Sequence, residues 1–375
     1  MSKKTSLSLL DHLADLPDPR INRTRRHELI DIVFVAVCGV IAGCNDFVSM
    51  ETYGKEKLSW LRKFVKLENG IPSHDTFGRV FAAIKAQAFV ECFLSWVESI
   101  RDAGVGEIVG IDGKTARASL DAKKGQHPLH VVSAWACENQ LLLGQVAVDV
   151  KSNEITAIPR LLEILELEGA IVTIDAMGCQ KEIAAKIRER GADYVLAVKG
   201  NQEHLQEDII RCFAKLDENA ADKDERSVHE TKERSHGRDE FRRYEAVAVP
   251  EELRHQEEWK DLKSIGRVTR VYTEKGEPRS DVRYFISSQK PSAKRLARAV
   301  RAHWGIENGL HWVLDMQFDE DRNRARTDNA AENLALLRRW VVSMLRQDTT
   351  MKGSINKKRQ MAGWTDEKME TLLGL

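Results

Sequence analysis

The chain has 375 residues, enough for two or three domains with ample core, and its 58 basic and 58 acidic side chains cancel. Hydrophobic residues make up 42% and charged residues 31%, an ordinary composition for a soluble protein. No stretch of about 18 uncharged apolar residues is present, so we expect no membrane span, and no signal peptide is indicated. The six cysteines show no zinc spacing, so we expect reduced, mostly buried thiols in a cytoplasmic protein.

The charges are unevenly distributed. Residues 20–27 contain four arginines and no acid, and residues 338–359 contain seven Lys or Arg against one acid. Residues 201–262 hold 18 acids against 11 bases. Basic ends around an acidic middle suit a polyanion such as nucleic acid, although charge runs can also be plain solvated faces.

Residues 1–104 are predicted to form an N-terminal helical domain. Pro17 and Pro19 end a short amphipathic helix, and a largely buried helix over residues 27–43 ends at Gly43. Ser73 is a plausible N-cap for the last helical stretch. A small helical bundle with basic tips suits DNA binding or an assembly role, and nothing in it looks catalytic.

From about residue 105 the spacing of apolar residues changes from that of helices to that of strands. Strand candidates over residues 107–117, 128–137, 141–150, 170–178 and 193–200 alternate with helices in the order β-β-β-α-β-α-β. This order predicts an α/β fold, with a mixed sheet and flanking helices in residues 105–200. Residues 201–288 are polar and are predicted to be a β-rich insertion, with strands near residues 244–250, 265–274 and 282–288.

Residues 291–326 are predicted to form a helix that returns the chain to the sheet, within a last part of the core spanning residues 289–345. Ser292 is a good N-cap. One helical face carries Leu296, Val300, His303, Glu307, Leu310 and Leu314. Glu307 therefore faces the core and needs a metal ion, a cation or a proton, and a structural ion pair with an arginine is the plain alternative. Residues 346–375 are expected to be a basic, mobile tail.

Asp112 and Asp175 occur in the same local sequence pattern, and this pattern suggests a role for Glu307. Asp112 and Asp175 each follow an apolar strand run and precede a small residue within two positions. Groups at the carboxyl ends of strands converge on one crevice, and a divalent cation relieves their repulsion. Hard oxygen ligands favour Mg²⁺ or Mn²⁺, and two such ions suit in-line phosphodiester cleavage. An aspartate alone at a strand end is more often a turn or cap residue, so the prediction depends on the three acids together.

Other side chains give weaker signals. Lys114 and Arg117 could contact phosphate or be ordinary exposed bases, and His303 and His311 could assist a metal site or simply pack. Trp304 and Trp312 are expected in the core rather than stacked on bases. P-loop, Rossmann and GxSxG motifs are absent, so the sequence does not support an NTPase, a dehydrogenase or a serine hydrolase.

Several stretches together resemble a known family: VGIDGKTAR, KSNEITAIPRLLEIL, TIDAMGCQKEIAAKI, YVLAVKGNQ, SHGRDE and HWGIENGLHWVLDMQFDED. They are similar to the H-repeat-associated proteins of Rhs elements, which are bacterial insertion-sequence transposases with an Asp-Asp-Glu triad. The resemblance implies a ribonuclease-H-like core with Asp112, Asp175 and Glu307 as catalytic triad and metal ligands, and Mg²⁺ or Mn²⁺ as cofactor. It covers most of the chain.

One departure concerns phosphate handling. Related transposases often carry Tyr-x-x-Arg-x-x-x-Glu-x-x-x-x-x-x-Lys, and here Val300, His303 and Leu314 stand at the Tyr, Arg and Lys positions. Candidates to replace these side chains are Lys294, Arg298, Arg301, Arg322, Arg324 and Arg326. The wider set of candidate DNA contacts is Lys114, Arg117, Lys199, Arg298, Arg301, His303, Arg322, Arg324 and Arg326.

We therefore expect a DNA transposase that cuts the ends of its own mobile element and joins the 3′-hydroxyl to target DNA. Its partners would be double-stranded DNA, as terminal inverted repeats and target, and a second copy of the chain, near the bacterial nucleoid. The alternatives are a metal-dependent endonuclease without strand transfer and a catalytically inactive, DNA-binding descendant of a transposase.

Overall fold

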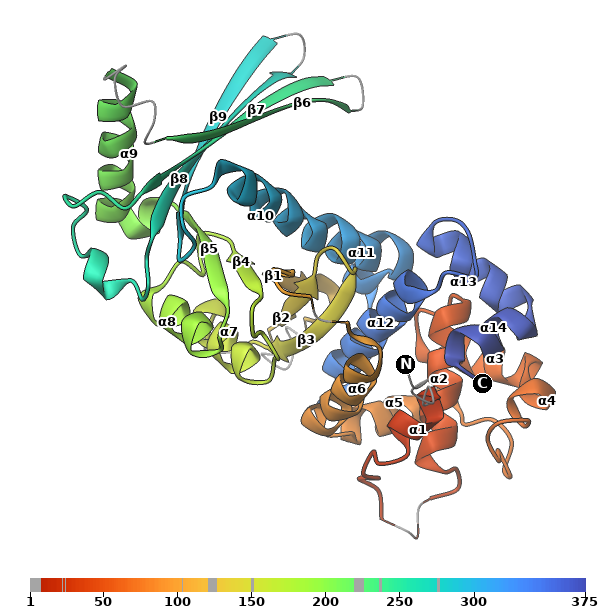
Figure 1. Cartoon of the computed structure of the whole chain (residues 1–375). Helices are drawn as coiled ribbons and strands as arrows, with labels where there is room; N and C mark the ends of the chain where they lie inside the picture. The colour runs from red at the N-terminus through yellow and green to blue at the C-terminus, as the bar shows by residue number, and fades with distance from the viewer. Residues whose placement is uncertain are drawn as a thin grey trace, which may run out of the picture.

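The described part of residues 1–104 forms the expected bundle of helices. The structure is a computed structural model that describes residues 8–21, 23, 25–102, 104–120, 127–149, 152–218, 226–235, 238–274 and 277–375. The bundle contains α1 (Leu9–Leu13), α2 (Leu29–Ala42), α3 (Phe47–Glu56), α4 (Leu58–Leu61), α5 (His74–Ala83) and α6 (Ala86–Ile100) (Figure 1). Helix α2 is apolar on nearly all sides and almost wholly buried, and it ends where Gly43 adopts φ +109°. The Ser73 hydroxyl accepts a hydrogen bond from the Thr76 amide, so the predicted cap of α5 is confirmed.

A nine-stranded mixed sheet forms the centre of the molecule, with the order β3-β2-β1-β4-β5-β9-β8-β7-β6. Its first part contains β1 (Ile108–Ala116), β2 (Leu129–Ala136), β3 (Leu141–Ala147), α7 (Glu154–Glu163), β4 (Ile171–Ile174), α8 (Lys181–Glu189) and β5 (Asp193–Val198). Strands β1, β2 and β3 pair antiparallel, whereas β4 and β5 run parallel to β1. This is the predicted β-β-β-α-β-α-β order in a ribonuclease-H-like sheet.

The insertion extends this same sheet. After α9 (Glu203–Glu218), strands β6 (Ser227–Ser235), β7 (Arg238–Ala248), β8 (Ser264–Glu274) and β9 (Glu277–Ser287) pair in antiparallel order, and β9 joins the core through β5. In Figure 1 these strands reach away from the core as a long arm. The three strands expected here are present, but β6 and α9 were not predicted. The sequence of β6, SVHETKERS, lacks alternating apolar residues, so its strand form depends on pairing with β7.

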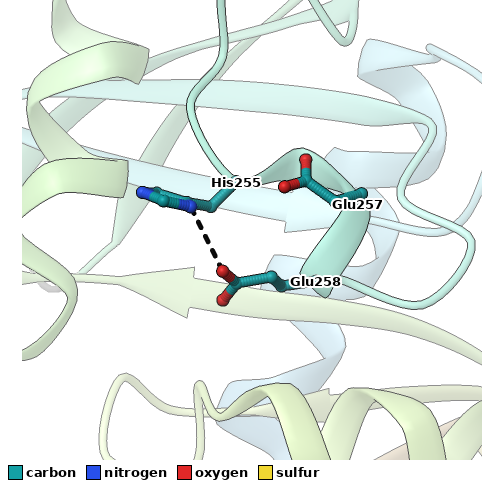
Figure 2. A group of neighbouring side chains, drawn as sticks. All are labelled: His255, Glu257 and Glu258. Atoms are coloured by element: carbon teal, nitrogen blue, oxygen red, sulfur yellow. Dashed lines mark ion pairs between the residues drawn. The ribbon is translucent and has the colours of Figure 1, made fainter.

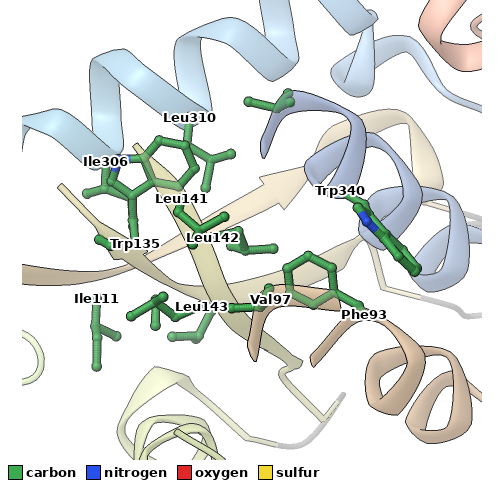
Figure 3. Close-up of a cluster of buried hydrophobic side chains, with 14 of the residues drawn as sticks. Phe93, Val97, Ile111, Trp135, Leu141, Leu142, Leu143, Ile306, Leu310 and Trp340 are labelled. Carbon is green, nitrogen blue, oxygen red and sulfur yellow. The ribbon is translucent and has the colours of Figure 1, made fainter. Parts of the chain in front are cut away.

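Helices flank the sheet on both faces. Helix α10 (Ala293–Ile306) crosses one face from β1 to β6, and α7 and α8 cover the other (Figure 1). Helix α12 (Ala330–Gln347) packs against both β3 and the N-terminal helices. Figure 3 shows the shared core, in which Trp340 of α12 lies beside Phe93 of α6, with ring centroids 5.5 Å apart. The helical bundle and the sheet are therefore joined by a continuous apolar core.

The C-terminal segment differs from the expected mobile tail. Residues 355–373 form α13 (Ile355–Trp364) and α14 (Asp366–Leu373), and α13 packs on α2 and α12. The Arg359 guanidinium is buried, donates to the Val40 carbonyl at 2.8 Å and lies 3.9 Å over the Phe318 ring. Arg338, Arg339 and Lys358 are also buried. Four of the seven basic residues in 338–359 thus act inside the protein, and this charge run is not the polyanion surface that its composition suggested.

The six cysteines are free thiols, and four of them are buried, as expected. Among the described residues, no single helix combines the length and apolarity needed to cross a membrane.

Candidate active site

Strands β1 and β4 bring the two aspartates together. The parallel register pairs Ile111 with Ile174, so Asp112 and Asp175 occupy the next matching positions. Matched residues on adjacent parallel strands lie roughly 4.8 Å apart along the hydrogen-bond direction and point to the same face of the sheet. Asp175 directly follows β4, as predicted, whereas β1 continues four residues beyond Asp112 to Ala116. Asp112 therefore lies within its strand and not at the strand end that the sequence suggested.

Glu307 lies where the expected single helix is interrupted. The hydroxyl of Ser292 caps α10 by accepting from the Arg295 amide, as predicted. Residues Glu307–His311 then form a π-helical turn, followed by α11 (Trp312–Phe318). In a straight α-helix, residues eight apart are rotated by about 80° from each other. The wider π-turn reduces this angle, which turns His303, Glu307 and His311 towards one side, and such turns recur at functional sites.

The predicted burial of Glu307 is wrong. Leu296, Leu310 and Leu314 are buried, but Glu307 is exposed at the mouth of a cavity. This cavity has a volume of about 340 Å³, and its lining includes Asp175, His303 and Glu307. The buried leucines lie towards the two ends of this helical segment. Between them, the Glu307 carboxylate is open to solvent. A solvent-accessible carboxylate is free to bind a ligand.

His303 lies among all three carboxylates. Its Nδ1 is 3.0 Å from the Thr173 hydroxyl, on the β4 residue two before Asp175. Burial lowers the pKa of His303, while the charges of Asp112, Glu307 and Asp175 act in the opposite direction. The side chain of His303 is thus within electrostatic range of each acid, although the three acids are far apart in the sequence.

Asp112 has a second imidazole beside it. The His311 Nδ1 lies 3.3 Å from the Asp112 Oδ2. Burial tends to raise the pKa of Asp112, but the hydrogen bond from His311 and the charges of His311 and His303 outweigh it and hold that pKa below its usual value. Asp112 is therefore ionised at neutral pH, as a metal ligand must be.

The donor set fits hard divalent cations. Asp175 Oδ1 accepts hydrogen bonds from the Met177 and Gly178 amides at 3.0 and 3.4 Å, which orients the carboxylate at the turn after β4. The three acids do not all have an oxygen within 4.8 Å of one another. In this structure the three carboxylates are therefore not close enough together to share one ion.

A compact acidic group elsewhere is a poorer candidate. Among the described residues, His255, Glu257 and Glu258 are the group whose ligand atoms lie within 4.8 Å of one another (Figure 2). All three are exposed, and Glu258 already pairs with His255 and Lys181. These residues lie in the insertion, between β7 and β8, and not beside the strands that carry Asp112 and Asp175.

Three of the predicted DNA contacts are engaged within the protein. Lys114 is buried, with its Nζ 2.6 Å from Asp315 of α11. Arg298 makes two hydrogen bonds to Glu138, at 2.6 and 2.7 Å. Arg301 pairs with Glu233 of the insertion at 2.9 Å. These side chains tie α10 and α11 to their neighbours, so they are weaker candidates for phosphate binding than the sequence suggested.

Four other predicted contacts, Arg117, Lys199, Arg322 and Arg324, are exposed. Arg322, with 85% of its side chain exposed, and Arg324 line a cavity of about 720 Å³ between α3, α5 and residues 319–327. Arg326 lines the same cavity but donates to the Ala118 carbonyl at 3.1 and 3.2 Å. Arg117 is 84% exposed, and Lys199 lines the cavity of Asp175 and Glu307.

The position of Lys114 gives a testable prediction. Replacing Lys114 by Met should lower the free energy of unfolding by about 1–3 kcal/mol, because Asp315 loses its charged partner in a partly buried place. Urea denaturation measures this loss. DNA affinity and its salt dependence should stay unchanged; a lower salt slope for this variant would show that Lys114 contacts phosphate after all.

Comparison with known proteins identifies the family. The family model described as "Transposase DDE domain" matches residues 104–344, which contain all three acids. The chain belongs to the DDE transposase family. A second model, "DDE_Tnp_1-associated", matches residues 10–97 of the helical bundle.

Relatives of this DDE transposase cover nearly the whole chain. "Putative transposase YncI" of Escherichia coli O157:H7 is 43% identical over 94% of this chain and 91% of its own length. "H repeat-associated putative transposase YhhI" of Escherichia coli K12 is 38% identical over 94% of both chains. The predicted relation to H-repeat-associated proteins is confirmed. A solved piggyBac transposase synaptic complex with hairpin DNA aligns at a TM-score of 0.45 and 11% identity, covering 99% of this chain and 77% of that one, a likeness too low to carry an argument.

Sequence reasoning missed several features of this transposase. Trp304 and Trp312 are not core residues: they are 36% and 54% exposed, and Trp304 lines the cavity that contains Glu307. The contribution of strand β9 to the cavity, through Asp281 and Arg283, was also not predicted. The exposure of these tryptophans could not be predicted, because apolar spacing alone does not tell which side of a helix meets the core.

Proposed function

We propose that this DDE transposase cleaves phosphodiester bonds at the ends of its element in a Mg²⁺- or Mn²⁺-dependent reaction and joins the 3′-hydroxyl to target DNA. The observations that support the proposal are the matched positions of Asp112 and Asp175 on neighbouring strands and the cavity lined by Asp175, His303 and Glu307. The two aspartates come from adjacent parallel strands and the glutamate from the helix above them.

Each residue has a definite task in this proposal. Asp112 and Asp175 would hold the ions at the sheet, and Glu307 would complete the second ion's ligands from the helix. Bound ions would activate the attacking hydroxyl and stabilise the leaving oxygen. His303, through its contact with the Thr173 hydroxyl, would hold helix α10 against strand β4. His311 orients Asp112 through their 3.3 Å contact.

The proposed DNA path follows the exposed cations on one side of the molecule. Arg322 and Arg324 face the cavity between the helical bundle and residues 319–327, and Arg117 is close by, since it contacts Asp321 at 3.5 Å. We propose that double-stranded element ends pass over this side, with residues 1–104 as the DNA-binding and assembly domain. A homodimer would bring two ends together, in the bacterial cytoplasm at the nucleoid.

The test is cleavage of labelled element ends with Mg²⁺ and with EDTA. We expect nicked or cut ends only with the metal, and joined products when a target plasmid is added. Cleavage without joined products would identify the endonuclease alternative. Binding of the ends without any cleavage in Mg²⁺ or Mn²⁺ would identify the inactive descendant and contradict the proposal.

A further inference from the structure

The helix that carries Glu307 offers no free cation to the candidate site. Val300 and Leu314, neither of them basic, stand seven residues before and after Glu307, and His303 is held against Thr173. The nearest arginines on this helix, Arg298 and Arg301, are paired with Glu138 and Glu233. A phosphate at this site therefore needs its cationic partner from another element.

Two cations line the cavity from the other side. Among the described residues, the Lys and Arg side chains lining it are Lys199 and Arg283. Lys199 directly follows β5 and Arg283 lies on β9, the insertion strand that pairs with β5. The antiparallel register matches Val198 with Tyr284, which makes Lys199 and Arg283 the next opposed pair. Lys199 keeps an extended backbone there, at φ −139°.

Two like charges directly opposite each other on neighbouring strands repel. The pair gains stability only when an anion lies between or above them. In the free protein, the Arg283 Nε is 3.0 Å from Asp281, two residues earlier on the same face of β9, which neutralises one of the two cations. Lys199 is exposed and lines the cavity that contains Asp175 and Glu307.

Trp304 fixes Arg283 relative to the acids. The Arg283 guanidinium carbon lies 5.8 Å from the centroid of the Trp304 ring, within the range of a cation–π contact. Trp304 is three residues before Glu307, close to one helical turn away. A planar guanidinium held over a ring also keeps its fork of N–H donors available for two oxygens of one phosphate.

We propose that Arg283, together with Lys199, binds phosphate at this active site and supplies the cation that the paired arginines of the Glu307 helix do not offer. The inference rests on the proposed function and deepens it: the β-rich insertion supplies the cation that holds the scissile or adjacent DNA phosphate. Asp281 occupies Arg283 in the free protein and gives it up when the phosphate binds.

The test compares Arg283→Gln with a matched control, Arg279→Gln. Arg279 lies four residues earlier on the same face of β9, outside the cavity lining, and meets Glu274 only at 3.9 Å. End binding is measured without added metal at several salt concentrations, so that this readout is independent of cleavage. Arg283→Gln should lower the slope of log affinity against log salt by about one, whereas Arg279→Gln should leave it unchanged.

Cleavage by the full-length protein gives a second readout. At saturating DNA, Arg283→Gln should cut about a hundredfold more slowly, with partial recovery in Arg283→Lys. Asp281→Asn should bind ends more tightly, because it releases Arg283. An unchanged salt slope for Arg283→Gln, or equal losses in both arginine variants, would overturn the inference. If wild-type protein does not cleave, the proposed function fails, and the salt slopes still decide the role of Arg283.

Discussion

Replacing Glu307 by Gln should abolish DNA cleavage while leaving end binding intact. Gln keeps the size and polarity of the side chain but removes the charge that would help to hold the second ion. An ion that stabilises a leaving oxygen contributes several kcal/mol to the transition state, so we expect a loss of at least about a thousandfold. The measurement is single-turnover cleavage of labelled ends in Mg²⁺.

Glu91→Gln provides the matched control. Glu91 is an exposed glutamate within α6, whose described partner is Gln87 at 3.3 Å. The Glu91→Gln protein should cleave at the wild-type rate. Because Glu307 is exposed in the free protein, neither variant should change the free energy of unfolding. A Glu307→Gln protein that still cleaves at a tenth or more of the wild-type rate would remove Glu307 from the catalytic set.

Breaking the buried pair of Glu320 and Arg339 should have the largest effect on stability. Both side chains are only 1% exposed, with Arg339 Nη1 2.5 Å from Glu320 Oε1. Arg339→Met leaves a carboxylate buried and unpaired, so we expect a loss of about 3–5 kcal/mol in the free energy of unfolding. Urea denaturation of the full chain measures it.

The double variant Arg339→Met/Glu320→Leu separates a lost pair from lost packing. Removing both charges also removes the desolvation cost, so most of the stability should return. Losses that simply add in the double variant would show that the pair itself contributes nothing. Glu320 begins the turn that leads to Arg322 and Arg324, so the single variant should also weaken DNA binding by loosening that segment.

Much of the site could be predicted because its signals are local. Asp175 follows a short buried strand, and Ser292 caps a helix with clear apolar spacing; both depend on neighbours within a few residues. The order of strands and helices along the core could also be predicted, from the changes in apolar spacing. These features explain why two acids more than sixty residues apart could be assigned to one crevice.

The rest depends on tertiary contacts. The π-turn at Glu307–His311 has no signature in the spacing, and it changes which side of the helix meets the sheet. Arg338 and Arg359 look like surface charges in the sequence. In the structure, however, Arg338 donates to the Asn45 carbonyl, 293 residues away, and Arg359 to the Val40 carbonyl, 319 residues away. Burial lowers the pKa of both guanidinium groups to about 10, so they stay charged at neutral pH.

The central claim is that Asp112, Asp175 and Glu307 hold two divalent ions against a DNA end. Crystals of the protein with an element end, soaked in Mn²⁺, would test it directly through anomalous scattering. We expect two peaks about 3.5–4 Å apart, ligated by these three carboxylates. Peaks confined to the exposed His255, Glu257 and Glu258 group, or none near Asp112 and Asp175, would contradict the claim.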